Sequence, residues 1–316
     1  MAIREFERTI DISPQEEQPY TNLLQLYENM GRVCVDSGCD LSGYSDRIKD
    51  VHRRAMNSSV GGALSLNNIA AYQINVIRRS LFLVEDPNSA FGELTKYANQ
   101  ALALNPSNYE TYQVLAEAHL LMAEAEVARG AAGGAGDSVV AAGAQIDEGL
   151  VAAQKAISLK ADDARSHKLL GQLLALQAAQ LGKKARQPAF EAARAAAERA
   201  VALNPRDPAH SQALAEVWLR TAQWQRLRHK SLDESIAAGL LATTAALRIN
   251  PRHPYSFVTR GALLLEQALA TRAKPARQAT LLAAREALTT AVTHNKLLTK
   301  QVAPLLDVVA AQLTPQ

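Results

Sequence analysis

The chain has 316 residues, of which 48% are hydrophobic, only 5% are aromatic and 59 are alanine. Alanine and leucine favour helices whereas strands favour β-branched and aromatic residues, so the composition excludes a β-rich fold and predicts a mostly helical protein. The net charge is +3, but residues 1–160 carry 20 acidic and 13 basic side chains, and residues 161–316 carry 11 and 21. The two halves have opposite net charges, which indicates either compositional drift between solvated faces or two surfaces with different partners.

Several classes of protein are excluded. The two cysteines, Cys34 and Cys39, are too few for a disulfide framework, and a single C-x4-C spacing cannot complete a four-ligand zinc site. The charged N-terminus lacks the apolar centre of a secretory signal, and no segment approaches the roughly 20 apolar residues of a membrane span. We therefore expect no membrane segment and a reducing, cytoplasmic setting.

A marker that ends one helix and begins another recurs along the chain. Its clearest copies are Leu104-Asn105-Pro106, Leu203-Asn204-Pro205 and Ile249-Asn250-Pro251. Asn tolerates the left-handed conformation that ends a helix, and Pro suits the first turn of the next. With weaker copies, the markers place boundaries near 14, 58, 106, 161, 205, 251 and 296. They enclose six units, and such periods are typical of helical repeats.

Residues that break helices lie near the middle of five units and divide each into two helices. They are Asp36-Ser37-Gly38, Asp86-Pro87-Asn88, Gly130 to Gly136, Gln187-Pro188 and Lys274-Pro275. The fifth unit lacks such residues between Arg226 and Ser231. Residues 1–13 align with the last turns of a second helix, so we interpret them as the tail of a preceding repeat. We expect either that the chain is a fragment or that a separate upstream piece supplies the missing helix. Residues 297–316 are predicted to form a C-terminal capping helix.

Small side chains recur at fixed places in the units. Ten residues after four markers lie Ala116, Gly171, Ala215 and Gly261, and five residues before five markers lie Ala101, Ala156, Ala200, Ala246 and Ala291. Small residues let paired helices approach closely while large neighbours such as Leu115 and Leu170 fill the space beside them.

This pattern resembles the tetratricopeptide repeat (TPR), with Leu-Gly or Leu-Ala on the first helix, Ala on the second and Pro at the junction. The resemblance covers essentially the whole chain and is weaker in the first two units, where Leu24, Asn68 and Arg53 occupy the small positions. The period is about 45 residues instead of 34, which implies longer helices; HEAT repeats have that period but lack the Asn-Pro junction. The resemblance implies an all-α, right-handed α-solenoid of about six helix pairs with a C-terminal cap, acting as a protein-binding scaffold.

The stretch from Asn295 to Leu306 is similar to the end of the TPR segment that follows the catalytic domain in some bacterial Ser/Thr protein kinases. That ending has Asn-Pro-Leu-Leu and a later Pro-Leu-Leu, and here Lys296 replaces the first proline. The resemblance implies a non-catalytic region that recruits partners in a kinase signalling system. No enzyme is expected in these residues themselves, because His52-Arg53-Arg54 and Ala90-Phe91-Gly92 lack the aspartates of the kinase motifs.

No cofactor or metal site is predicted. The seven histidines are scattered, and no His-x3-His or Cys/His cluster occurs. The segment Gly130 to Ser138 is rich in glycine but lacks the Gly-Lys-Ser/Thr of a phosphate-binding loop, so a flexible insertion is favoured.

One candidate partner site lies on the concave face, which TPR arrays line with their first helices. Positions four, seven and eleven residues after the markers place these polar residues there: Glu110, Gln113, Glu117, Arg165, Lys168, Gln172, Gln212 and Glu216. Such a lining suits an extended peptide or a polar partner surface. The family's carboxylate clamp is not reproduced, because Ala213, Tyr255 and Thr259 occupy its later positions.

A second candidate is a basic edge formed near the mid-unit turns of the last three units. Its residues are Lys183, Lys184, Arg186, Arg226, Arg228, Lys230, Arg272, Lys274 and Arg277. Stacking places successive turns on one edge, where an acidic protein, another anionic ligand or a nucleic acid would dock. Alternatively, the charged side chains serve only to keep the loops solvated. The lack of interleaved aromatic residues argues against single-stranded nucleic acid. A further alternative is a self-assembling scaffold in which the acidic half of one copy meets the basic half of the next.

Overall fold

The computed structural model describes residues 2–131, 137–180 and 183–314, which form α-helices, one short 3-10 helix and no strand. In chain order the helices are α1 (Ala2–Ile12), α2 (Glu17–Ser37), α3 (Ser42–Asn57), α4 (Ala63–Leu83), α5 (Asn88–Leu104), α6 (Tyr109–Ala131), α7 (Asp137–Leu159), α8 (Ala164–Gln180), α9 (Lys183–Leu203), α10 (Pro208–Arg226), α11 (Asp233–Ile249), α12 (Pro254–Ala270), α13 (Lys274–His294), η1 (Lys296–Leu298) and α14 (Thr299–Leu313). The all-α class that the composition predicts is confirmed for these residues.

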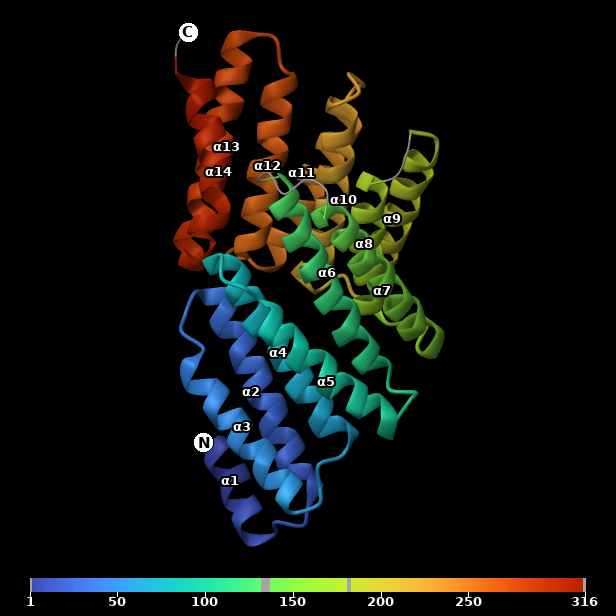
Figure 1. The fold of residues 1–316 in the computed structure, drawn as a ribbon. Coiled ribbons are helices and arrows are strands. Elements are labelled where there is room, and N and C mark those ends of the chain that lie inside the picture. Colours follow the sequence, from blue (N-terminus) through green and yellow to red (C-terminus); the bar gives the residue numbers. More distant parts are fainter. Residues whose placement is uncertain (1, 132–136, 181–182, 315–316) are drawn as a thin grey trace.

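Adjacent helices pack as pairs, from α2 with α3 to α12 with α13 (Figure 1). The first helix of each pair also contacts the first helix of the next, so α2, α4, α6, α8, α10 and α12 form a continuous inner layer. The second helices lie outside them, and α14 packs on α13. This arrangement is the TPR-like solenoid that the repeat pattern predicts.

Small residues hold the paired helices close together. The five alanines that precede the markers are fully buried: Ala101, Ala156, Ala200, Ala246 and Ala291. A Cβ atom on Gly171 would lie 2.9 Å from the carbonyl oxygen of Ala193 in the partner helix, so a larger side chain would force α8 and α9 apart. The predicted role of these small residues is confirmed.

In the fourth and fifth units the helix breaks differ from the expectation based on helix-breaking residues. Pro188 lies inside α9, which begins at Lys183; little more than one turn precedes it, so the proline removes one hydrogen bond near the helix end without ending the helix. In the fifth unit α10 ends at Arg226 and α11 begins at Asp233, with His229 in the left-handed region at φ 52°. The break therefore forms without glycine or proline. Of the predicted glycine-rich insertion, residues 132–136 lie outside the described residues.

Helix α1 covers the N-terminal end of the inner layer. It packs on α2 and buries Ile10 in a cluster with Tyr20, Leu23 and Val51. The upstream piece expected from the sequence stays a prediction.

The C-terminal end of the solenoid packs against its N-terminal half (Figure 1). One apolar core combines Val35 and Phe82 with Leu288 and Val302. Beside it, Lys300 of α14 donates from Nζ to the carbonyl oxygen of Leu83 at the end of α4, 2.8 Å away. The solenoid thus closes on itself.

A disulfide joins Cys34, in the last turn of α2, to Cys39 in the loop that follows. The expected reducing, cytoplasmic setting stays a prediction. Gly38 adopts a left-handed conformation with φ 79° and turns the chain back, so that the two Cα atoms are 4.9 Å apart. Two cysteines exclude a framework of several disulfides. Whether they form one local disulfide depends on the conformation of the turn between them, which the number of cysteines does not reveal. Among the described helices, none has the length and apolarity to cross a membrane.

Candidate partner-binding site on the concave face

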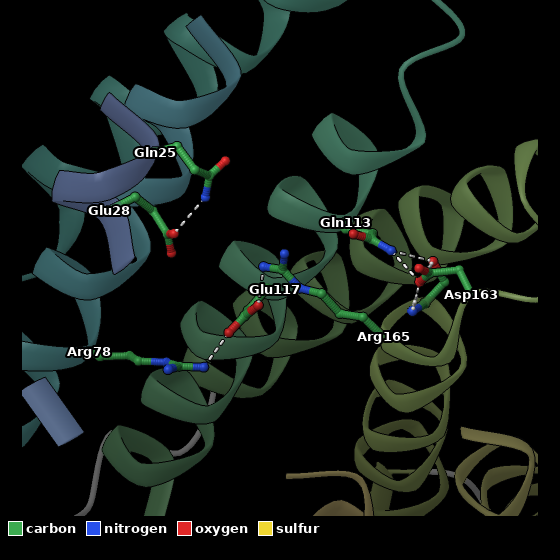
Figure 2. Close-up of polar contacts among 8 residues, drawn as sticks. Gln25, Glu28, Arg78, Gln113, Glu117, Asp163 and Arg165 are labelled. Carbon is green, nitrogen blue, oxygen red and sulfur yellow. Dashed lines mark hydrogen bonds and ion pairs between the residues drawn. The ribbon is translucent and has the colours of Figure 1, made fainter. Parts of the chain in front are cut away.

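An ionic cluster lies within the inner layer of first helices, the layer predicted to line the concave face (Figure 2). Glu117 of α6 is 6% exposed and lies between Arg78 of α4 and Arg165 of α8. Arg78 forms an ion pair with Glu117 Oε1, and the Arg165 Nη2 atom lies 2.7 Å from Glu117 Oε2. Across the face, Gln25 and Glu28 project from α2 toward the same region, with 3.1 Å between Gln25 Nε2 and Glu28 Oε2.

The cluster carries more positive than negative charge. Burial alone would raise the pKa of Glu117, but Arg78 and Arg165 together hold it well below its ordinary value. Burial lowers the pKa of the Lys168 ammonium; Glu117 opposes this effect and Arg165 adds to it. Burial also raises the pKa of Glu28. Three basic side chains, those of Arg78, Arg165 and Lys168, therefore face the two carboxylates of Glu117 and Glu28.

The other predicted concave residues form separate hydrogen-bonded groups. Glu216 accepts from Gln172 Nε2 at 2.7 Å and from Gln212 Nε2 at 2.6 Å, which links α8 to α10. Gln113 donates to Ser166 Oγ at 2.9 Å and to Asp163 Oδ2, which links α6 to the start of α8. These side chains are therefore already partnered within the chain.

Glu110 does not join these groups. It lies exposed in the first turn of α6, where its Oε1 accepts from the hydroxyl of Tyr109 at 3.1 Å.

Sequence reasoning missed several residues of the concave face, among them Arg78, Glu28, Glu124 and Arg220. The Arg220 Nη2 atom of α10 lies 2.9 Å from Glu124 Oε1 of α6, which ties two non-adjacent pairs. Burial raises the pKa of Glu124 to about 7, an effect that Arg220 opposes and Glu216 reinforces. The sequence-based positions stop at eleven residues after each marker. Arg220 and Glu124 lie fifteen and eighteen residues after their markers, at the same helical spacing. Because the first helices of this chain are long, their later turns also line the inner face.

The basic edge is only partly available for docking. Helices α11 and α13 begin at the same end of the C-terminal half (Figure 1). Arg226 forms an ion pair with Glu266, and Arg277 donates from Nε to the carbonyl oxygen of Thr271 at 3.0 Å, so both are engaged within the chain.

The remaining edge residues divide into three groups. The exposed ones are Arg228, Lys230, Arg272 and Lys274, while Arg186 is half-buried. The side chains of Lys183 and Lys184 lie outside what the structure describes.

The concave cluster offers fixed charges for recognition. In the described ranges, no group of three or more His, Cys, Asp or Glu side chains is placed to hold a metal ion. Ion pairs between neighbouring helices hold Arg78 and Arg165 in position, so the cations are ordered before any ligand arrives.

No protein-family model matches the sequence, and no curated protein matches it. Among solved structures, the chain is similar to the nuclear import adaptor Nro1, a hypoxic regulator of sterol synthesis, with 13% identity, a TM-score of 0.52 and coverage of 97% of both chains. A second structure of the S. pombe adaptor gives 12% identity and a TM-score of 0.53 over 92% of this chain and 99% of that one. At this identity the likeness shows a shared helical-repeat fold over nearly the whole of both chains, and the fold alone.

Proposed function

We propose that the chain is a protein-interaction scaffold whose concave face binds an extended, acidic segment of a partner protein. The observation that carries this proposal is Lys168, which lies beside Arg165 and makes no ion pair within the described residues. An acidic side chain of a partner would supply the missing counter-charge in a partly desolvated setting, where such pairing is strong. Because the cations are already ordered, we expect little rearrangement on binding.

We further propose that this scaffold is the non-catalytic, partner-recruiting region of a bacterial Ser/Thr kinase signalling system in the cytoplasm. The similarity of the ending from Asn295 to Leu306 to kinase-associated TPR segments supports this context. The shared fold with a nuclear import adaptor supports an adaptor role more generally. We propose no catalytic activity for these residues, because the sequence contains none of the motifs that phosphoryl transfer requires.

Charge reversal tests the concave face. The full chain would be cross-linked to its partners in lysate of its native cell as wild type, as Lys168→Glu and as the control Lys155→Glu, whose site is exposed on α7. We expect the wild type and the control to capture the same partners, and Lys168→Glu to lose about tenfold of the captured amount. Equal capture by all three proteins, with circular dichroism showing that all are folded, would contradict the concave site.

Self-assembly is a second candidate function, and the opposite charges of residues 1–160 and 161–316 favour it. Head-to-tail contacts between unlike halves would weaken as salt screens them. Sedimentation velocity at about 0.05 M and about 0.5 M salt distinguishes the two functions. A larger species that dissociates at high salt supports assembly, and a monomer at both concentrations eliminates it.

A further inference from the structure

A pocket of about 270 Å³ lies where α9, α10 and the start of α11 meet, beside the basic edge. It contains Trp218 and Trp224, the two tryptophans of the chain, together with Phe190. Phe190 and Trp224 form a tilted pair with ring centroids 5.7 Å apart. Trp224 lies only two residues before Arg226 in the sequence, and helix packing brings Phe190 and Trp218 to the same edge.

Two cations are held over the tryptophan rings. The Lys230 Nζ atom lies 4.6 Å from the ring centroid of Trp224, and the guanidinium carbon of Arg194 lies 5.2 Å from that of Trp218. Lys230 forms no ion pair among the described residues, and Arg194 has only a long contact of 3.7 Å with Glu198. Cation–π contacts thus position both charges at the pocket while leaving them available to an anion.

The pocket also contains two carboxylates, those of Glu191 and Glu234. Glu191 accepts from Gln187 Nε2 at 3.2 Å. Glu234 lies in the first turn of α11, where the helix dipole favours negative charge. The neighbouring Arg228 in the turn before α11 is exposed and adds a further positive charge. The lining therefore carries two basic and two acidic side chains, and neither Lys230 nor Arg194 is ion-paired with Glu191 or Glu234.

We propose that this pocket binds an acidic peptide segment of a partner protein through one aromatic side chain, with the flanking carboxylates on Lys230 and Arg194. A volume of about 270 Å³ is smaller than the roughly 300–1,000 Å³ of small-molecule sites and suits a single large side chain. Tryptophan and arginine are the residues most enriched at energetic centres of protein interfaces. Single-stranded nucleic acid fits less well, because Phe190 and Trp218 are only 4% and 9% exposed and offer no open row of ring faces for base stacking.

Intrinsic fluorescence gives a direct test, since both tryptophans belong to the pocket. The full chain would be titrated with acetyl-Asp-Glu-Phe-Asp-Glu-amide, with the same peptide carrying Ala for Phe, with a peptide carrying Lys for each acid, and with oligothymidylate. We expect a saturable change in tryptophan emission with the first peptide, and at least about tenfold weaker binding of each other probe. No saturable change, equal binding of the alanine peptide, or tighter binding of oligothymidylate would overturn the proposal.

Variants locate the site and separate it from the concave face. Lys230→Glu should weaken the first peptide about tenfold, whereas Lys274→Glu, on the same edge but outside the pocket, should change binding by less than about twofold. Trp224→Phe should lose most of the signal while circular dichroism stays unchanged. Equal effects of Lys230→Glu and Lys274→Glu would indicate a diffuse basic edge and contradict the pocket. Lys168→Glu should leave this binding intact, so the concave proposal and this one can fail independently.

Discussion

Asn295, fully buried, donates from Nδ2 to the carbonyl oxygen of Val35 at 2.8 Å across 260 positions of sequence. Its Oδ1 atom accepts from the backbone N–H of Leu297 at 3.0 Å and so caps η1. Nearby, the hydroxyl of Tyr255 donates to Asp36 Oδ1 at 2.8 Å. One asparagine therefore both begins the C-terminal cap and joins it to the N-terminal half.

Asn295→Ala should lower the free energy of unfolding by about 2–3 kcal/mol, because the cap is lost and so is the bond to the Val35 carbonyl. That carbonyl then keeps only the N–H of Gly38 as a donor, at 3.3 Å. Asn250→Ala is the matched control. Asn250 makes the same local bond, to the N–H of Arg252 at 3.0 Å, but lies exposed at its junction. That change should cost only about 1 kcal/mol. Urea denaturation measures both, and equal losses would show that the closing contact contributes nothing.

Gly38→Ala should destabilise the same closure. The backbone is left-handed here, and an added Cβ would lie 2.9 Å from Asn295 Oδ1 and 3.2 Å from the Lys296 nitrogen. We expect a loss of about 1–2 kcal/mol from the backbone conformation, plus a steric contribution. Gly92→Ala is the opposite case, because its Cβ inside α5 would meet nothing within 4 Å. It should stabilise by up to about 1 kcal/mol, and thermal melts that rank the two variants otherwise would contradict this account.

Glu117→Gln should destabilise the chain by about 2–3 kcal/mol at pH 7, less than breaking a fully buried ion pair costs, because Arg165 stays 41% exposed to water. The folded-state pKa of Glu117 lies below its unfolded value, so its contribution is present above about pH 4.3 and is lost as the pH falls through the folded pKa. The stability difference between wild type and variant, measured by urea denaturation, should therefore shrink as the pH falls below about 4. A constant difference would mean that the carboxylate charge is not what holds the two arginines.

Glu124→Gln should change the pH dependence in the opposite sense. Burial raises the folded-state pKa of Glu124 to about 7, so between about pH 4.3 and that value the folded state binds more protons than the unfolded state. The Glu124 contribution is then fully present below about pH 4.3 and is lost as the pH rises through about 7. Relative to Glu124→Gln, the wild type should lose stability between pH 5 and pH 8. Parallel stability curves across this range would contradict the raised pKa.

The sequence alone determined the local architecture. Buried alanines such as Ala156 and Ala246, and junctions such as Asn204-Pro205, act within one pair of helices or between neighbouring pairs, so their spacing reveals which segments pair. Several concave residues were accessible by the same counting, because a helix repeats its faces at a known interval. Arg220 and Glu124 were missed because the positions considered stopped at eleven residues after each marker.

Closure of the solenoid and the aromatic pocket were decided by the tertiary structure. The contact between Asn295 and Val35 depends on the summed rotation of every helix pair between them, and small packing angles that no residue pattern encodes accumulate over that distance. The pocket depends likewise on how α9, α10 and α11 meet, which places Trp218 and Trp224 beside Lys230. Local sequence sets which helices pair, whereas the accumulated geometry of the pairs sets which distant surfaces meet.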